Sequence, residues 1–298
     1  VGGAAVLGDH VEGVAELAGA WGGVRFAQST APAGGNRLEH AVARDGGGFD
    51  WNTSAAREAN VAVQEAVQVT LRDVVLAGSA GVGLFVGSPG AALTVDGLQV
   101  LANAGGAADV PAASMGAFPG TSAFGDDQPV HVRPGPIAAD QTWAACVPYR
   151  LRGDRISIGD GAQVTVAPGA RIESADAAGI LVDGGALRAL GEPTRAITFT
   201  GVDAAPGAWG GIRYAANTQR SANVLEHVVI EHAGGFDWNT SAAANANLNV
   251  TEATVRLAVR DSVLRKSAGL GLYVTEAGAD VTIEGLRFAD NADGAASV

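Results

Sequence analysis

Hydrophobic and polar residues alternate along this chain in short runs that are separated by turn residues. Ala196–Thr200 and Val281–Phe288 show the pattern, with apolar residues at alternate positions and a break at Gly285 in the second run. Gly, Asn, Asp and Pro-Gly pairs follow such runs at short intervals, and no long stretch has the spacing of an amphipathic helix. The pattern therefore predicts many short β-strands joined by tight turns.

The chain also repeats itself at a long interval. The decamer GGFDWNTSAA occurs at Gly47–Ala56 and again, without a change, at Gly234–Ala243. Similar segments flank both copies: Trp21–His40 with Trp209–His227, Leu71–Val86 with Val259–Val274, and Val95–Val110 with Ile283–Val298. Self-similarity at a fixed period indicates a repeat architecture. We expect two continuous modules, residues 1–140 lacking the start of the repeat and residues 141–298 lacking its end.

A shorter period lies inside each module. Val75 and Leu98 occupy similar places one short period apart, and the second module repeats this step from Val263 to Leu286. The preceding step, from Val42 to Val75 and from Val229 to Val263, is longer and contains the decamer. The decamer is therefore predicted to be an insertion into an otherwise regular coil.

Three short strands and three turns in about 23 residues are typical of one coil of a parallel β-solenoid, in which each strand pairs with its counterpart one coil away. An antiparallel β-sandwich array or a propeller is the alternative. Propeller blades, however, need about 40 residues and a strong aromatic signature. Only 5% of the residues are aromatic, which favours the solenoid.

Composition narrows the classes of partner. The net charge is −12, and this charge would repel a phosphate backbone or an anionic membrane surface, so neither nucleic acid nor membrane insertion is expected. No apolar run approaches the roughly 18 to 20 residues that span a bilayer. Cys146 is the only cysteine, which excludes an intrachain disulfide. Because the sequence starts at Val1 within the repeat pattern, we expect a removed signal peptide, a longer parent protein, or both.

Two long segments, Val147–Ser174 and Ile197–Gly235, carry a resemblance to a known group. They resemble the secreted bacterial right-handed parallel β-helix repeat proteins, whereas Val1–Gly19 departs from the pattern. The resemblance implies an all-β, right-handed parallel β-helix and an extracellular or cell-surface location. Its superfamily includes pectin and alginate lyases, polygalacturonases, adhesins and many surface proteins without a known role, so it implies architecture more than activity.

The residues offer little support for catalysis. Lyases of this fold use a Lys or Arg beside a uronate carboxylate, often with Ca²⁺ held by Asp and Glu, but the one lysine, Lys266, aligns with Gly78. Asp126 and Asp127 are adjacent in a predicted solvated turn, and no second Asp-rich coil accompanies them at the offset that a hydrolase needs. No cofactor is expected; Ca²⁺ stays open as an alternative that no motif indicates.

The pairs Glu39–His40 and Glu226–His227 precede the two insertions. Strand alternation would place neighbouring side chains on opposite faces, and the other histidines lack counterparts between modules, so we expect structural ladder residues and no metal site. Arg72–Asp73 and Arg260–Asp261 are predicted to be surface ion pairs. Recurring asparagines are predicted to form stacked turns; they are Asn36, Asn60 and Asn103 with Asn223, Asn247 and Asn291.

The decamer combines two aromatic residues with a carboxylate and an amide, which is the chemistry of a platform that stacks on a sugar ring and bonds its hydroxyls. The candidate ligand-binding residues are Phe49, Asp50, Trp51 and Asn52 with Phe236, Asp237, Trp238 and Asn239. The alternative is a plug, in which the aromatic side chains fold back onto the flank of the solenoid and the polar ones bond the turn backbone.

Duplication of a whole module without a shared catalytic constellation favours a structural role. We expect a secreted or cell-surface structural and adhesion module that displays duplicated loops to surface polysaccharide or surface proteins and is open to end-to-end self-association. A polysaccharide lyase or glycoside hydrolase of the parallel β-helix superfold is the alternative.

Overall fold

The structure, a computed structural model, describes residues 17–27, 36–48, 58–64, 66–176, 178–215, 223–235, 238 and 243–298. It is nearly all β, with 52% strand and 2% helix, and its long sheets are parallel, as an all-β parallel solenoid requires. The chain divides into two compact units. The first comprises Val1–Val132 with Cys146–Pro148, and the second comprises Arg133–Ala145 with Tyr149–Val298. This division reflects contacts in space, so the predicted modules 1–140 and 141–298 remain a prediction about the repeat.

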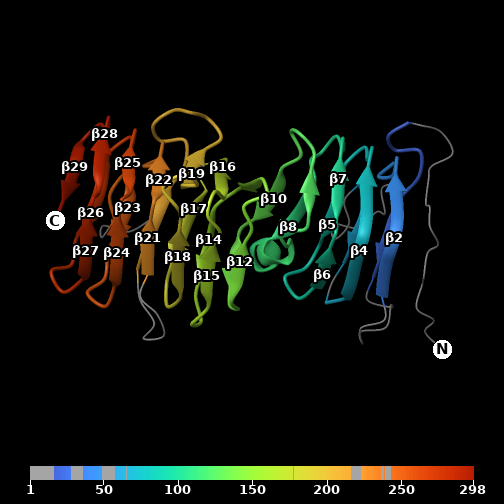
Figure 1. The fold of residues 1–298 in the computed structure, drawn as a ribbon, viewed down its shortest axis with the longest axis horizontal. Coiled ribbons are helices and arrows are strands. Elements are labelled where there is room, and N and C mark those ends of the chain that lie inside the picture. Colours follow the sequence, from blue (N-terminus) through green and yellow to red (C-terminus); the bar gives the residue numbers. More distant parts are fainter. Residues whose placement is uncertain are drawn as a thin grey trace. The chain divides into compact units, whose positions relative to one another are not determined.

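Three parallel sheets build the second unit, and their strands follow one another from green to red in Figure 1. The first sheet contains β11 (Gly135–Ile137), β14 (Arg155–Ile158), β17 (Gly179–Val182), β20 (Gly211–Tyr214), β23 (Ala246–Val250), β26 (Leu270–Val274) and β29 (Gly294–Ser297). The second contains β12 (Gln141–Trp143), β15 (Gln163–Val166), β18 (Ala186–Leu190), β21 (Asn223–Glu226), β24 (Arg256–Arg260) and β27 (Asp280–Glu284). The third contains β13 (Tyr149–Leu151), β16 (Arg171–Ser174), β19 (Ile197–Gly201), β22 (Val228–Glu231), β25 (Val263–Arg265) and β28 (Arg287–Ala289). One strand from each sheet forms one coil.

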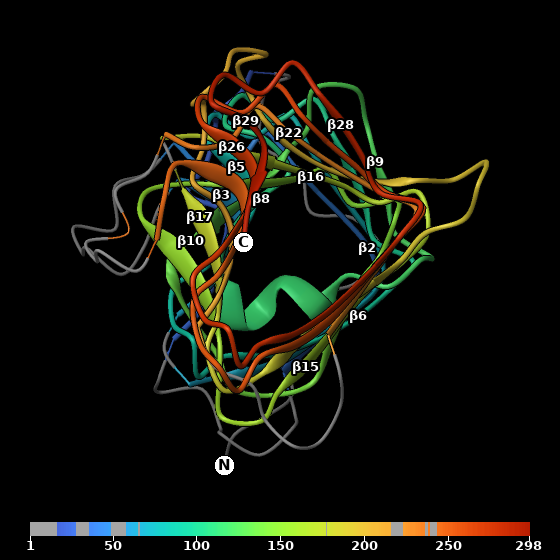
Figure 2. The same ribbon diagram turned by 90° about the vertical axis from the view of Figure 1, so that its left-hand side faces the viewer.

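The core of the second unit lies between its three sheets, which surround a common interior in Figure 2. Apolar side chains at alternate positions point inward and stack on the same position of the next coil. In the third sheet, Ile172 pairs with Phe199, Phe199 with Ile230 and Ile230 with Leu264, and all four are almost fully buried. Such columns bury apolar surface in every coil and stabilise the stack by about 25 cal/mol per Å² of apolar area removed from water.

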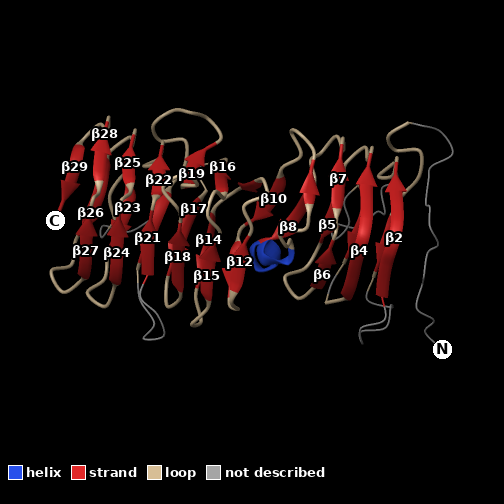
Figure 3. Ribbon diagram, in the orientation of Figure 1, coloured by secondary structure: helices blue, strands red, loops and turns tan. Residues whose placement is uncertain are grey.

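The first unit contains two parallel sheets and a short 3₁₀-helix, η1 (Ala112–Ala117), which is blue in Figure 3. One sheet has the order β1 (Val24–Phe26), β3 (Ala59–Val63), β5 (Val82–Val86), β8 (Ala108–Pro111) and β10 (Val130–Arg133). The other has the order β2 (Asn36–Arg44), β4 (Gln68–Ala77), β7 (Gln99–Leu101) and β9 (Ala123–Phe124), with β6 (Ala92–Asp96) also paired to β4. The helix packs against β6 and β8 and buries Met115 completely.

The steps that contain the insertion are confirmed, because Val42 pairs with Val75 and Val229 pairs with Val263. The shorter step is wrong by one position, because Val75 pairs with Gln99 and not with Leu98. Leu98 follows the corner residue Gly97, whose φ is +63°, and is fully buried, whereas Val75 faces outward and is half-buried. The similar spacing of Val75 and Leu98 therefore matched a residue that faces outward with a residue that faces the core.

Candidate functional site

Two glycines begin the repeated decamer, and the backbone packs tightly around them in both units. The Gly48 amide donates to the Trp21 carbonyl oxygen at 2.9 Å, and the Gly235 amide donates to the Trp209 carbonyl oxygen at 2.9 Å. A Cβ at Gly48 would overlap the Gly19 carbonyl, and a Cβ at Gly235 would overlap its equivalent, the Gly207 carbonyl. No larger side chain fits at these positions. Identity at the start of the decamer therefore has a packing cause.

The tryptophan before each insertion holds the same corner from the other side. Trp21 Nε1 donates to the Arg44 carbonyl oxygen at 2.7 Å, and Trp209 Nε1 donates to the Glu231 carbonyl oxygen at 2.7 Å. Trp209 is fully buried. Each insertion thus leaves the coil at a corner that one indole and two backbone segments fix in the same way, although the surrounding sequences have diverged.

Trp238, in the second copy of the decamer, is only 6% exposed. Its ring lies against Gly179 at the start of β17, where an added Cβ would come 2.7 Å from the Trp238 Cη2 atom. The Arg213 guanidinium carbon lies 5.9 Å from the centre of the same ring, within the range of a cation–π contact. Arg213 Nε also donates to Thr251 Oγ1 at 3.1 Å. Trp238 therefore packs on the flank of the solenoid, between β17 and β20, as a plug would.

Arg213 is half-buried by this packing. Burial lowers the pKa of its guanidinium, and the nearby charge of Arg155 acts in the same direction, while Asp183 and Glu252 oppose it. The other candidate binding residues, Phe49, Asp50, Trp51, Asn52, Phe236, Asp237 and Asn239, lie outside the described residues. The role of the decamer in binding a ligand consequently remains a prediction.

Buried asparagines stack beside the insertion in the first unit. The Asn60 side chain accepts from the Gly46 amide at 2.9 Å and donates to Asn103 Oδ1 at 3.1 Å. Asn103 Oδ1 also accepts from the Ser79 amide at 2.9 Å, and Asn103 Nδ2 donates to Gln128 Oε1 at 3.2 Å. The ladder thereby satisfies backbone groups that strand pairing leaves open at the corner.

The second unit repeats this ladder. Asn247 Oδ1 accepts from the Ala233 amide at 3.2 Å, and Asn247 Nδ2 donates to the Arg265 carbonyl at 3.0 Å and to Asn291 Oδ1 at 3.2 Å. Asn291 Oδ1 also accepts from the Ser267 amide at 3.0 Å. These contacts show stacked asparagine side chains at four of the six predicted positions, but the predicted stacked turns are wrong for Asn60 and Asn247, which lie within the strands β3 and β23. The other two, Asn36 and Asn223, lie at a different corner, where each donates to a backbone carbonyl of the next coil.

Opposite charges pair between coils on the outer face. Glu39 pairs in register with Arg72, and their side chains approach to 3.3 Å; Glu226 pairs with Arg260, with the side chains 3.8 Å apart. The predicted Arg72–Asp73 pair is wrong, because Asp73 lies 3.3 Å from His40 Nδ1 on the neighbouring coil. Glu39 and His40 both face outward, since His40 has a φ of +50° and interrupts the alternation that we expected of the strand.

Two further candidates from the sequence lie at turns. Asp126 and Asp127 are exposed in a turn, as predicted, and Asp127 has a φ of +53°. Lys266 has a φ of +54° and occupies the corner that Gly78 occupies in the first unit, with a φ of +65°.

The sequence did not reveal a buried polar cluster on the third sheet of the second unit. Thr200 Oγ1 lies 3.1 Å from His232 Nδ1, which lies 3.9 Å from Glu231 Oε1. Glu231 Oε2 accepts from Arg265 Nε at 2.7 Å. Thr200, Glu231 and His232 are at most 7% exposed. A signal was present in the repeat, because the counterparts of Glu231 and His232 in the first module are Arg44 and Asp45, but only the strand register brings Thr200 and Arg265 to them.

Glu231 and His232 of this cluster have shifted pKa values. Burial lowers the pKa of His232, with the charges of Lys266, Arg265 and Arg171 acting in the same direction and that of Glu231 opposing. Burial raises the pKa of Glu231, but its hydrogen bond and charge interaction with Arg265, together with the His232 charge and the Thr200 hydroxyl, outweigh burial and lower that pKa overall. At neutral pH the cluster therefore contains a neutral His232 beside an ionised Glu231.

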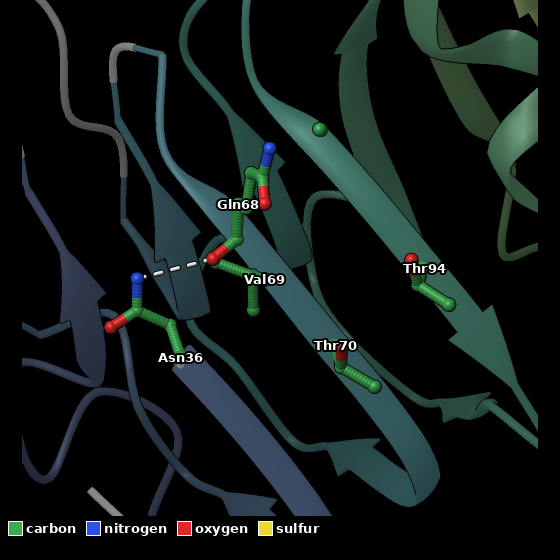
Figure 4. Close-up of a pocket in the computed structure, with 6 residues that line it drawn as sticks. Asn36, Gln68, Val69, Thr70 and Thr94 are labelled. Atoms are coloured by element: carbon green, nitrogen blue, oxygen red, sulfur yellow. Dashed lines mark hydrogen bonds between the residues drawn. The ribbon is translucent and has the colours of Figure 1, made fainter. Parts of the chain in front are cut away.

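An open groove of about 240 Å³ lies on the outer face of the first unit (Figure 4). Its walls come from the first residues of β2, β4 and β6, and Asn36 Nδ2 donates to the Gln68 carbonyl at 3.1 Å across it. The lining residues are Asn36, Gln68, Val69, Thr70, Ala92 and Thr94. Amide and hydroxyl groups of this kind can bond sugar hydroxyls. The second module has Arg256, Ala258 and Asp280 in place of Gln68, Thr70 and Ala92, so the lining of the groove is not shared.

Comparisons with known proteins identify no relative: no family model, no curated protein and no solved structure matches this chain. Within the described ranges, no three His, Cys, Asp or Glu side chains gather as metal ligands. Among the same residues, no helix has the length and apolar character to cross a bilayer.

Proposed function

We propose that this chain is a secreted or cell-surface structural and adhesion module, folded as a right-handed parallel β-helix, that displays two copies of one loop. The identical anchoring of the two insertions carries this proposal. In both units a glycine pair, a tryptophan indole and an asparagine ladder hold the corner from which the decamer leaves. A chain that maintains two equivalent loops gains avidity for a repetitive surface, whereas catalysis needs one site.

The resemblance to secreted bacterial β-helix repeat proteins supports the handedness and the extracellular location. The net charge of −12 supports an uncharged or cationic surface partner, such as a polysaccharide or a surface protein, over nucleic acid. In this proposal Trp238 secures the loop of the second module. The polar residues of the decamer, Asp50 and Asn52 with Asp237 and Asn239, contact the partner.

Retention on surfaces and glycans tests the proposal. One variant replaces Asp50 and Asn52 by Ala, a second replaces Asp237 and Asn239, and a third replaces all four. We expect each single-loop variant to lose about 10²-fold or more of its retention on a polyvalent glycan surface while the affinity of the remaining loop for a soluble fragment stays unchanged. The third variant should lose both.

Circular dichroism and thermal unfolding provide the control, because the glycines and tryptophans that anchor the loop are untouched. Asp126→Asn with Asp127→Asn, in an exposed turn outside the loop, is the matched control for lost surface carboxylates. Retention by the four-residue variant equal to that of the unmodified chain would refute adhesion through the loops. Release of unsaturated or reducing sugars from pectin, alginate or other uronans would favour the lyase or hydrolase instead.

A further inference from the structure

The groove on the outer face of the first unit presents hydrogen-bonding groups that the fold does not use. Gln68 and Thr94 are exposed, and Thr70 is half-buried (Figure 4). Asn36 Nδ2 donates to the backbone carbonyl of Gln68. Within the described part of the chain, the side chains of Gln68, Thr70 and Thr94 themselves make no hydrogen bond. One amide and two hydroxyl groups are therefore available to a ligand.

The strand register places these groups beside one another. Thr70 of β4 pairs with Thr94 of β6, and Gln68 pairs with Ala92 in the same ladder. Because alternate residues of a strand share one face, Gln68 and Thr70 point to the same side of β4. Val69 lies between them, is 2% exposed and adds apolar atoms to the lining. A ligand in the groove therefore meets two hydroxyl groups and an amide beside a small apolar surface.

The groove has room for a segment of a longer ligand. Its volume of about 240 Å³ is smaller than the roughly 300–1,000 Å³ of pockets that enclose a whole small molecule. It is also open to solvent, and neighbouring strands lie about 4.8 Å apart, so a ligand can continue across the coils beyond the lining residues. A polymer with a regular repeat meets this condition better than a compact molecule does.

The chemistry of the lining favours a neutral ligand, because none of the residues that line the groove is ionisable. Amide and hydroxyl side chains both donate and accept hydrogen bonds, and a sugar hydroxyl does the same. A carboxylate, by contrast, only accepts, and an ammonium group only donates. The net charge of −12 also repels an anionic polymer. A neutral polysaccharide therefore matches the groove better than a uronan or a charged peptide.

The second module keeps the backbone arrangement of this place and changes its lining. The contact of Asn36 recurs at Asn223, whose Nδ2 donates to the backbone carbonyl of Arg256 at 3.2 Å. Three lining positions differ: Gln68, Thr70 and Ala92 are replaced by Arg256, Ala258 and Asp280. Because Arg256 pairs in register with Asp280, opposite charges meet where the first unit has an amide beside a methyl group. The chain thus contains its own matched reference for the groove.

We propose that the groove lined by Asn36, Gln68, Thr70 and Thr94 binds a segment of a neutral polysaccharide. The Thr70 and Thr94 hydroxyls and the Gln68 amide bond the sugar hydroxyls, and Val69 contacts the apolar C–H groups of the ring. This site is additional to the loops of the proposed function and does not depend on them. Because the lining occurs in the first module alone, it contributes no avidity of its own.

Calorimetric titration with soluble oligosaccharides tests this site. The titrated chain is the variant in which all four polar loop residues are replaced by Ala, so that the loops do not contribute. The probes are neutral gluco-, manno-, xylo- and galacto-oligosaccharides, with oligogalacturonate for comparison. We expect a neutral probe to bind at one site per chain. Thr70→Val with Thr94→Val removes both hydroxyls, keeps the branched shape of the side chains and should weaken this binding by about tenfold.

Exchange of the lining between the modules provides a matched pair of variants. Gln68→Arg with Thr70→Ala and Ala92→Asp gives the groove the residues of the second module and should abolish binding. The reciprocal variant, Arg256→Gln with Ala258→Thr and Asp280→Ala, should about double the number of sites per chain. Each new residue already occupies the equivalent position of the other module, so both variants should fold, which circular dichroism checks.

Several results would overturn the groove as a glycan site. They are the absence of binding by every neutral probe, tighter binding of oligogalacturonate, unchanged affinity in the folded valine variant, and a single site in the reciprocal variant. The adhesion proposal is judged separately, because the same groove substitutions are also made in the chain with intact loops. Retention that depends on the loop residues, with groove substitutions that change no affinity, refutes the groove and leaves the adhesion module standing. The reverse result refutes adhesion through the loops and supports the groove.

Discussion

Gly179 and Trp238 offer a direct test of whether the repeated loop is secured by packing. Gly179→Ala adds one methyl group at a position without positive φ, so the backbone tolerates alanine. The added Cβ would lie 2.7 Å from Trp238 Cη2 and 3.2 Å from Trp238 Cζ2, and no other side chain comes as near. The whole cost of the substitution should therefore come from the indole ring.

The expected energies follow from this geometry. Overpacking costs about 1–3 kcal/mol, and the entropy that alanine removes from the unfolded chain returns about 0.4–1 kcal/mol, so Gly179→Ala should destabilise the protein by about 1–2 kcal/mol. Trp238→Ala removes a ring that is 6% exposed and should cost about 3–5 kcal/mol. With the ring absent, Gly179→Ala should be neutral or stabilising. The coupling between the two substitutions should then be about 1–3 kcal/mol.

Urea unfolding of the four proteins of this cycle, followed by circular dichroism, measures the coupling. Hydrogen exchange of the β17 amides shows whether the change is local. Gly120→Ala, where nothing lies within 4 Å of the added Cβ, is the control and should have the same small effect in both backgrounds, a stabilisation of up to about 1 kcal/mol. An equal cost of Gly179→Ala with and without Trp238, or a cost of Trp238→Ala below about 0.5 kcal/mol, would refute packing as the reason for the tryptophan.

Three further outcomes follow from the described contacts. Asn247→Ala should cost about 3 kcal/mol in urea unfolding, because it strands several buried polar groups at about 1–3 kcal/mol each; a cost below about 1 kcal/mol would contradict the ladder. A double-mutant cycle on Glu226 and Arg260 with glutamine should give a coupling below about 1 kcal/mol, since both side chains are partly exposed; a larger coupling would show that the outer ladder holds the coils together. The pKa of His232 is lower in the folded state than in the unfolded state, where it is about 6.5. The contribution of His232 to folding stability is therefore present above about pH 6.5 and is lost as the pH falls through the folded-state pKa. Asparagine tolerates the φ of +64° at this position, so His232→Asn should fold. This substitution should reduce the fall in thermal midpoint between about pH 7 and pH 5. An unchanged dependence of the midpoint on pH would exclude His232 as the source of that fall.

The repeat and its insertions could be predicted from the sequence because the two modules can be aligned with each other, and the alignment shows which positions are kept in both. The long steps from Val42 to Val75 and from Val229 to Val263 match the strand register. The error at Leu98, by a single position, arose at Gly97, because a residue with positive φ turns the chain without continuing the alternation of sides. Corners of this kind cannot be located by hydrophobic pattern alone, since His40, Asp73 and Lys266 occupy them as well as glycine does.

Side-chain contacts between neighbouring coils were the other feature that could not be predicted from the sequence. An ion pair such as Glu39–Arg72 joins residues on neighbouring coils, and the sequence suggested instead that adjacent Arg72 and Asp73 pair with each other. The sequence offered a plug as one of two readings of Trp238, but it did not show that the ring packs against Gly179, which lies far earlier in the chain and on a different coil. The asparagine ladder was accessible because its members recur in both modules at matching places.

The corner at Gly48 has a consequence for protein engineering. The chain is held by the Trp21 carbonyl before the insertion and returns to the parallel sheet at Ala59, which pairs with Val82, and the second unit repeats the arrangement from Gly235 to Ala246, which pairs with Leu270. Foreign polypeptide placed between these anchors adds only a slowly growing loop entropy and does not shift the register of the coils. Each chain thus provides two equivalent insertion sites, at which the length and sequence of the inserted polypeptide can be varied without changing the coils.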